Sequence, residues 1–345
     1  MKDLDKLVRN NIRVMRPYSS ARDEYEGDGE IFLDANENPF DTGLNRYPDP
    51  YQRKLKAKIA ELKSVRTEQL FLGNGSDEAI DLILRIFCEP GKDEIITLDP
   101  TYGMYQVSAA IQDISVRKAP LSRRFELSAN SVLRQVDSTT KVIFLCTPNN
   151  PSGNDLDHDE IRKIITAFSG IVVIDEAYTD FSNAPSFTLS LDQYSNVIVL
   201  QTFSKAWGMA ALRLGMAFTS PQIIRYLNKV KAPYNLNLLA QREAMVRLNE
   251  VNEVRQMAEE LKKARVQLVE QIATLPIVKE IFPSSANFLL VRFTDSKTVF
   301  NYLIKKEIIV RDRSKALYCE NCLRITVGTS EENDKLLKAL NSLNA

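Results

Sequence analysis

One lysine near the middle of the chain has the surroundings that chemistry on an amine needs. Lys205 follows the apolar, strand-like run 197–200. Hydroxyl side chains lie one and three residues before it, at Ser204 and Thr202, and Arg213 lies eight residues after it. A lysine at a strand end, with hydroxyls and a fixed cation nearby, suits an amine that forms an imine beside a bound phosphate. Pyridoxal 5'-phosphate (PLP) is a cofactor of that kind, and a surface lysine in a turn is the alternative.

Two loops could hold other groups of the same ligand. Gly75, Ser76 and Asp77 lie between a strand-like and a helical segment, where the N–H groups of the helix start bind anions. An ordinary helix cap has the same composition. Asn150 lies between two prolines in the segment 148–153, which restrict the backbone and hold its amide rigidly. A plain turn is the alternative there.

An acidic residue follows the most apolar run of the chain. Asp175 comes directly after 171–174, and Tyr178 follows three residues later. A carboxylate at the end of a covered strand is costly unless a cation or a hydrogen-bond donor meets it. A protonated pyridine nitrogen is such a partner, and it makes the PLP ring an electron sink. A helix cap or a metal ligand is the alternative.

The elements that must position these residues alternate along the chain. Short β-branched runs and helical patterns follow one another from about residue 50, which predicts an α/β/α sandwich around a mostly parallel, seven-stranded sheet. The carboxyl edge of such a sheet is where ligands bind. Strands are expected at 70–72, 94–98, 114–117, 141–146, 171–174, 197–201 and 214–218, and helices at 77–88, 102–112 and 157–168.

The pattern changes after Pro221 and predicts a smaller α+β domain. It combines a long charged helix at 251–273 with strand-like runs at 286–293, 308–311 and 322–327 and helices at 296–306 and 331–343. We therefore expect a large PLP-binding domain at 36–235 and a small domain at 236–345. The arm 1–35 is expected to cross onto the small domain.

Composition excludes several classes of protein. Lys+Arg and Asp+Glu number 45 each in 345 residues, so there is no overall field for nucleic acid or a membrane surface. No apolar run approaches a membrane span of about 18 residues, and the first residues lack the apolar core of a signal peptide. We expect a cytoplasmic protein. Cys319 and Cys322 lack further zinc ligands and are interpreted as structural thiols, and His158 as a solvated helix residue.

Taken in order, the four polar segments resemble those of the fold-type I, PLP-dependent aminotransferases. The resemblance covers essentially the whole chain. More narrowly, it points to the branch that transaminates L-histidinol phosphate with 2-oxoglutarate in histidine biosynthesis. An aromatic amino-acid aminotransferase and an L-threonine-O-3-phosphate decarboxylase remain alternatives. The narrower resemblance rests on the segments 16–18, 34–39, 45–48, 100–105 and 322–328.

The resemblance implies a role for each candidate residue. Lys205 would bind the cofactor and move the proton between the substrate Cα and the cofactor C4', and Asp175 would hold the pyridinium. Asn150 and Tyr178 would donate hydrogen bonds to the ring oxygen, and Tyr102 would stack on the ring. The cofactor phosphate would be bound by Gly75, Ser76, Asp77, Thr202, Ser204 and Arg213.

The resemblance also implies a homodimer with shared active sites. Tyr47 would reach the cofactor phosphate of the other subunit. Tyr18, Asn36, Arg311 and Arg324 would bind the substrates, a phosphorylated amino alcohol and a 2-oxo acid, and the two arginines would hold their anionic groups. A transcription regulator built on the same fold needs a further DNA-binding domain, for which we expect no room in the first 35 residues.

Overall fold

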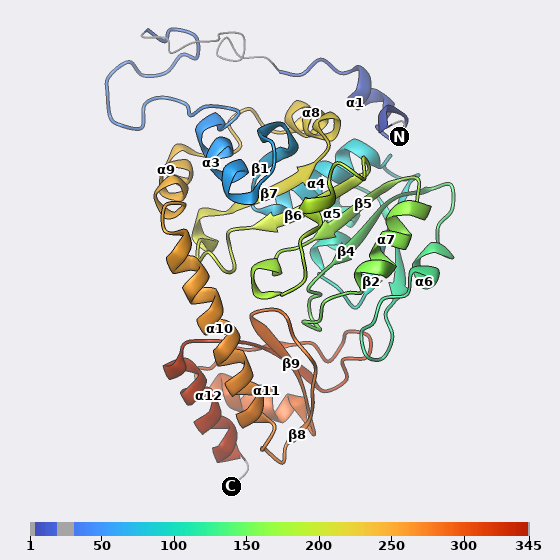
Figure 1. Ribbon diagram of the computed structural model, residues 1–345, viewed down its shortest axis with the longest axis vertical. Helices are drawn as coiled ribbons and strands as arrows, with labels where there is room; N and C mark the ends of the chain where they lie inside the picture. Colours follow the sequence, from blue (N-terminus) through green and yellow to red (C-terminus); the bar gives the residue numbers. More distant parts are fainter. Residues whose placement is uncertain (1–3, 19–30, 344–345) are drawn as a thin grey trace.

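The computed structural model describes residues 4–18 and 31–343, which fold around two β-sheets (Figure 1). The larger sheet has seven strands in the order β1-β7-β6-β5-β4-β2-β3. Only β7 is antiparallel to its neighbours, β1 and β6, and the other pairs are parallel. The strands are β1 (Leu70–Asn74), β2 (Glu94–Asp99), β3 (Ser115–Pro120), β4 (Thr140–Cys146), β5 (Ile171–Asp175), β6 (Val197–Thr202) and β7 (Leu214–Thr219).

Helices cover both faces of this sheet, so its central strands are apolar throughout. In β5, Val172 and Ile174 pack toward α3, α7 and α9, whereas Ile171 and Val173 pack toward α4, α5 and α8. Successive side chains of a strand point to opposite faces, and here both faces are buried. The predicted sandwich is confirmed. Its helices are α3 (Arg53–Lys63), α4 (Ser76–Phe87), α5 (Met104–Ile111), α6 (Ala129–Leu133), α7 (His158–Ala167), α8 (Pro221–Val230) and α9 (Leu238–Arg247).

The smaller unit is an antiparallel sheet in the order β10-β11-β9-β8, with helices packed on one face. Its core includes Leu289, Leu323 and Leu340. The elements are β8 (Val278–Ile281), β9 (Phe288–Phe293), β10 (Arg311–Asp312), β11 (Cys322–Thr326), α11 (Ser296–Lys305) and α12 (Ser330–Leu343). The predicted α+β character is confirmed, and the boundary at 235/236 stays a prediction.

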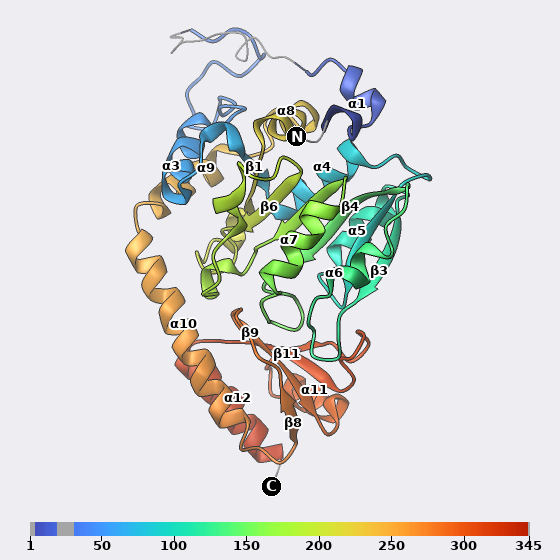
Figure 2. The ribbon, with the colours of Figure 1, turned by 45° about the vertical axis from the view of Figure 1, so that its right-hand side comes forward.

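One long helix belongs to both units. α10 (Val251–Ile272) runs from the side of the large sheet down along the small one (Figure 2). Val254 and Ala258 pack in the core of the large unit, and Leu268 and Ile272 pack in the core of the small unit. A helix buried at both ends holds the two sheets in a fixed relation. Within the described ranges, no helix has the length and apolar character to cross a membrane.

The N-terminal arm does not follow the prediction. The residues of α1 (Asn10–Val14) and the turn before it lie beside α8, and Leu4 and Ile12 are buried with α4 and α8 in the core of the large unit. The expectation that the arm crosses onto the small unit is therefore wrong for residues 4–14. A short apolar pattern without helical length gave no sign of which surface it would cover.

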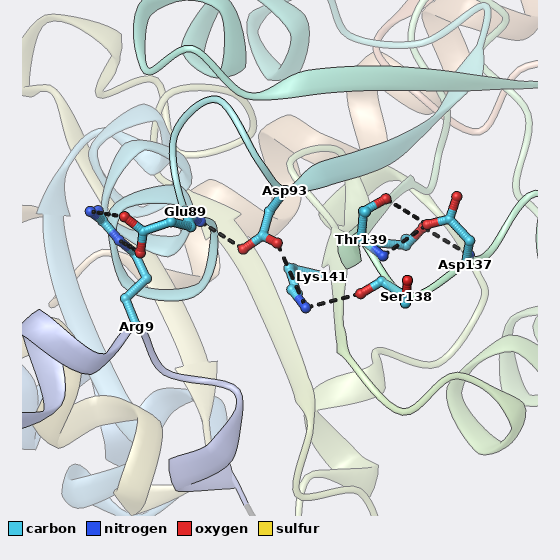
Figure 3. Close-up of polar contacts among 8 residues, drawn as sticks. Arg9, Glu89, Asp93, Asp137, Ser138, Thr139 and Lys141 are labelled. Carbon is cyan, nitrogen blue, oxygen red and sulfur yellow. Dashed lines mark hydrogen bonds and ion pairs between the residues drawn. The ribbon is translucent and has the colours of Figure 1, made fainter.

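Polar contacts tie this arm to the amino ends of the parallel strands (Figure 3). Arg9 donates to both carboxylate oxygens of Glu89, at 3.2 and 3.3 Å. The Glu89 N–H donates to Asp93, which lies 3.7 Å from the Lys141 ammonium, and Lys141 in turn donates to the Ser138 carbonyl. The network closes the edge of the sheet at which β2 and β4 begin, which leaves the carboxyl edge for the site.

Two smaller expectations also differ from the structure. The strand expected at 308–311 is reduced to β10, because only Arg311 and Asp312 pair with β11. His158 is half-buried, and its ring centroid lies 4.5 Å from that of Phe187. The cysteines are buried and unpaired by disulfides, as expected of structural thiols.

Candidate active site

A cavity of about 180 Å³ opens at the carboxyl ends of β4, β5 and β6. The structure brings together there every predicted cofactor-binding residue except Tyr47. Asp175 and Thr202 are the last residues of β5 and β6, and Cys146 ends β4 opposite Asp175. Parallel strands that end at one edge bring residues far apart in the sequence together. The lining comprises Gly75, Ser76, Asp77, Tyr102, Cys146, Asn150, Asp175, Ala177, Tyr178, Thr202, Ser204, Lys205 and Arg213.

The Asp175 carboxylate is buried, with 3% of the residue exposed. The Tyr105 hydroxyl donates to its Oδ2 at 2.5 Å, and the Ala177 N–H donates to its Oδ1 at 3.1 Å. Burial raises the pKa of Asp175 to about 6, although these two hydrogen bonds act in the opposite direction. No ion pair to this carboxylate occurs among the described residues. A buried acid held by donors but lacking a cation fits the pyridinium of PLP.

Tyr105 was not predicted as a site residue. It is fully buried on α5, with its ring stacked on Phe144 at a centroid distance of 4.7 Å. The available signal was its spacing, because Tyr105 lies three residues after Tyr102 in the helix expected at 102–112, and residues three apart share a face of a helix. In the structure the helix begins later, at Met104. Tyr102 itself lines the cavity and donates to Asp77 at 3.2 Å.

The Lys205 side chain projects into the cavity from the turn after β6. Its ammonium nitrogen lies 5.7 Å from the centroid of the Tyr178 ring. Burial and the nearby Arg324 guanidinium lower the pKa of Lys205, against the opposing effect of Asp175. A lower pKa leaves more of the neutral amine, which is the form that attacks an aldehyde.

A chain of hydrogen bonds joins the small unit to the cavity. Arg324, on β11, donates to the Asn150 Oδ1 at 2.6 Å, and the Asn150 amide donates to the Tyr178 hydroxyl at 3.4 Å. Burial raises the pKa of Tyr178, so this phenol keeps its proton. The arrangement presents an amide, a phenol and a guanidinium to the same part of a ligand.

The opposite side of the cavity is built for an anion. The loop residue Gly75, with φ +78°, precedes α4, so the N–H groups of the first helical turn point into the cavity. A side chain at Gly215 would overlap the backbone of Gly75 and Ser76, so β7 can pass close beneath the loop because it carries glycine there. Arg213 lies beside this loop, 3.3 Å from Asp77.

The remaining predicted residues lie outside this cavity. Tyr47 and Asn36 line a separate surface hollow with Tyr234, on which the Tyr47 ring stacks at a centroid distance of 4.4 Å. Tyr18 is exposed. Arg311 lies on β10, directly across from Arg324 on β11. Within one chain, Arg311 is therefore connected to the site through Arg324. Tyr18, Asn36 and Tyr47 do not line the cavity of their own chain.

The buried carboxylate gives a prediction for the ligand-free protein. Asp175 has a pKa near 6 when folded and 3.8 when unfolded. The stability that the raised pKa of this group gives to the folded state is therefore fully present below pH 3.8, where the carboxyl group is protonated. It is lost as the pH rises through 6. Asp175→Asn should make the ligand-free protein more stable at pH 7, by roughly 1–3 kcal/mol. Urea unfolding between pH 4 and 7 measures this, with exposed Asp334→Asn as the control. The same pH dependence in both variants would contradict it.

Comparison with known proteins agrees with this geometry. The family model for aminotransferase class I and II matches residues 32–340. The chain is 52% identical to a histidinol-phosphate aminotransferase of Cytophaga hutchinsonii, over 98% of both chains, and 54% identical to one of Bacteroides fragilis, over 99% of both.

Solved structures share the fold. The histidinol-phosphate aminotransferase from Clostridium acetobutylicum superposes with a TM-score of 0.81 at 23% identity, over 88% of this chain and 91% of that one. The enzyme of that name from Sinorhizobium meliloti, in complex with pyridoxal-5'-phosphate, gives a TM-score of 0.79 at 20% identity, over 87% and 84%. With a family model spanning nearly the whole chain and relatives above 50% identity, the protein belongs to the class I and II aminotransferases.

Proposed function

We propose that the protein is a PLP-dependent histidinol-phosphate transaminase of L-histidine biosynthesis. It transfers the amino group of L-histidinol phosphate to 2-oxoglutarate and yields imidazole acetol phosphate and L-glutamate. The observation that carries this proposal is the near full-length identity with curated histidinol-phosphate aminotransferases. The cavity adds the required chemistry, an amine beside a buried acid with an anion site on each side. We place the enzyme in the cytoplasm.

The residues around the cavity fit PLP, which when bound supplies an electron sink for the bonds of the substrate Cα. Asp175 would hold the ring nitrogen in its protonated form, since a buried carboxylate is stabilised by a cation. Asn150 and Tyr178 would donate to the ring oxygen. The loop at Gly75, the hydroxyls of Thr202 and Ser204, and Arg213 would bind the phosphate, with Tyr102 beside the ring.

Lys205 would carry the cofactor between turnovers and move one proton between the substrate Cα and the cofactor C4'. Its lowered pKa suits both tasks, because a neutral amine can bind an aldehyde and can accept a proton. Arg324 would bind the anionic end of each substrate. A guanidinium forms paired hydrogen bonds with a phosphate or a carboxylate, which suits a pocket that receives both in turn.

We also propose that two chains form a homodimer with shared sites. The segment leading into α3 extends away from the body of the molecule (Figures 1 and 2). It exposes large apolar side chains, with 80% of Ile31, 87% of Leu33 and 77% of Phe40 accessible. Apolar surface of this kind is typical of an interface. Tyr47 lies on the same segment, outside its own chain's cavity, where it could reach the cavity of a partner; Tyr18 and Asn36 would act from the same side.

The substrate proposal predicts the outcome of a half-reaction. L-histidinol phosphate should convert the holoenzyme absorbance to that of the pyridoxamine form without release of CO2. Removing the phosphate from the donor should lower kcat/KM more than about 10-fold, or ~1.4 kcal/mol, because an arginine contact is lost. Equal rates with phenylalanine would instead support an aromatic aminotransferase. Release of CO2 from L-threonine-O-3-phosphate would support the decarboxylase.

The shared-site proposal predicts complementation between two defective chains. Tyr47→Ala and Lys205→Ala homodimers should each be strongly impaired. After mixing and refolding, half of the dimers are mixed and contain one intact site, so activity should recover toward about one quarter of wild type. Activity of the mixture equal to the average of the two variants, or a fully active monomer by light scattering, would contradict the proposal.

The hydrogen bond from Tyr105 to Asp175 predicts a further effect on turnover. Tyr105→Phe removes a donor to a buried carboxylate, a contact of about 1.5–3 kcal/mol, so kcat should fall roughly 10- to 100-fold. KM should change little, because Tyr105 does not line the cavity. Steady-state kinetics measure both constants. Tyr226→Phe is the matched control, since its hydroxyl binds Asp5 at 2.7 Å, away from the cavity. Equal effects of the two variants would argue against a role for Tyr105.

A further inference from the structure

A third arginine lies beside the pair expected to bind substrate anions. Arg311 and Arg324 are directly paired across β10 and β11, and the Arg313 N–H continues this pairing by donating to the Cys322 carbonyl at 2.9 Å. Residues two apart on a strand share a face, as do directly paired residues. Arg311, Arg313 and Arg324 therefore lie on one face of the small sheet.

That face is turned toward the active-site cavity. Cys322, two residues before Arg324, is buried in the same core as Tyr178, whereas Leu323 belongs to the core of the small unit. Arg324 reaches the wall of the cavity, because its guanidinium donates to Asn150, which lines it. The Tyr178 phenol also acts on the pKa of both Arg313 and Arg324.

The three guanidiniums lack an anion in the described chain. The Arg313 Nε is buried and has no hydrogen-bond partner. No ion pair involves Arg311, Arg313 or Arg324 among the described residues, and the side-chain hydrogen bond of Arg324 goes to the neutral Asn150. Burial lowers the pKa of Arg313, and so do the neighbouring Arg324 and Arg311. Arg313 and Arg324 are partly buried, whereas Arg311 beside them is exposed. Like charges gathered around a partly buried pair are costly until an anion joins them.

Most partly buried arginines elsewhere in the described chain have acidic partners, and Arg265 donates to the Ala286 carbonyl instead. Arg117 lies 2.7 Å from Glu94, and Arg292 lies 3.5 Å from Glu280. Among the described residues, the Arg313 side chain has neither an acidic partner nor a carbonyl acceptor, although the chain contains as many acids as bases. Its missing partner is therefore best sought in a ligand.

We propose that Arg313 determines specificity for the phosphorylated donor: its guanidinium joins those of Arg311 and Arg324 around the substrate phosphate. The inference rests on the proposed function and deepens it. A phosphate dianion has three acceptor oxygens and nearly two charges, which three guanidinium groups can satisfy together. A carboxylate has one charge and two oxygens, so it gains less from the third arginine. Arg313 thus favours the phosphorylated substrate over donors that offer only a carboxylate to Arg324.

The test compares Arg313→Gln with Lys315→Gln in the holoenzyme. Lys315 is an exposed cation on the same segment, so its replacement removes the same charge without the buried position. Arg313→Gln should lower kcat/KM for L-histidinol phosphate about 10- to 100-fold, mainly through KM, and change that for L-histidinol less than about 3-fold. It should also weaken competitive inhibition by inorganic phosphate much more than inhibition by acetate. Lys315→Gln should change each value less than about 2-fold.

A second variant guards against an effect on folding. Arg313→Lys keeps the charge and loses the planar fork, so it should fall between wild type and Arg313→Gln. Equal losses with both donors would show a structural role and overturn the proposal, as would an unchanged KM for the phosphorylated donor. If the wild-type enzyme itself does not prefer the phosphorylated donor, the proposed function fails first, and that outcome is distinct from a failure of Arg313.

Discussion

The buried carboxylate of Asp175 is the constraint around which the large unit is organised. It ends the central strand β5, whose other residues are buried on both faces. Such a position offers little water to solvate a charge, so donors must come from the protein, here the Tyr105 hydroxyl and the Ala177 N–H. These contacts hold the carboxylate without neutralising it. Because the Asp175 carboxylate has no ion pair in the described chain, it is suited to bind a protonated pyridine ring.

The small unit reaches the site through contacts from β9 and β11, since Phe288 packs against the Tyr178 ring. Arg324 reaches from β11 to Asn150, which in turn holds Tyr178. The position of Arg324 relative to the cavity depends on how the two sheets are fixed, and α10 fixes them by being buried at both ends in different cores. A helix that does not line the cavity thereby helps to set the distance between the loop at Gly75 and the arginines of the small sheet.

Much of this architecture could be predicted from the sequence, because its signals are local. The apolar runs that became the central strands β4 to β7 are almost completely buried. Asp175 ends one of these strands, and Lys205 and Asn150 lie in the turns that follow two others. The ordered set of these segments predicted the aminotransferase family, which the family model confirms. Tyr105 and Arg313 were not predicted as site residues, because the contacts that suggest their roles are with residues distant in sequence. The position of the arm at 4–14 was also predicted wrongly, because its few apolar residues fit more than one surface.

The two proposed anion sites of the cavity use different chemistry, and we attribute the difference to how long each ligand would stay. The phosphate loop offers N–H groups of a helix start and two hydroxyls beside one arginine, donors that are fixed by the fold before a ligand arrives. Fixed neutral donors suit a cofactor that remains through many turnovers. On the other side, guanidinium groups of β10 and β11 would meet the ligand, and a guanidinium can pair with a phosphate or a carboxylate. Two substrates that must replace one another in a single pocket need a binding group of that kind. The unpaired charge of the partly buried Arg313 and Arg324 is thus the counterpart of the unpaired charge of Asp175. Each is a cost in the ligand-free chain that the correct ligand removes.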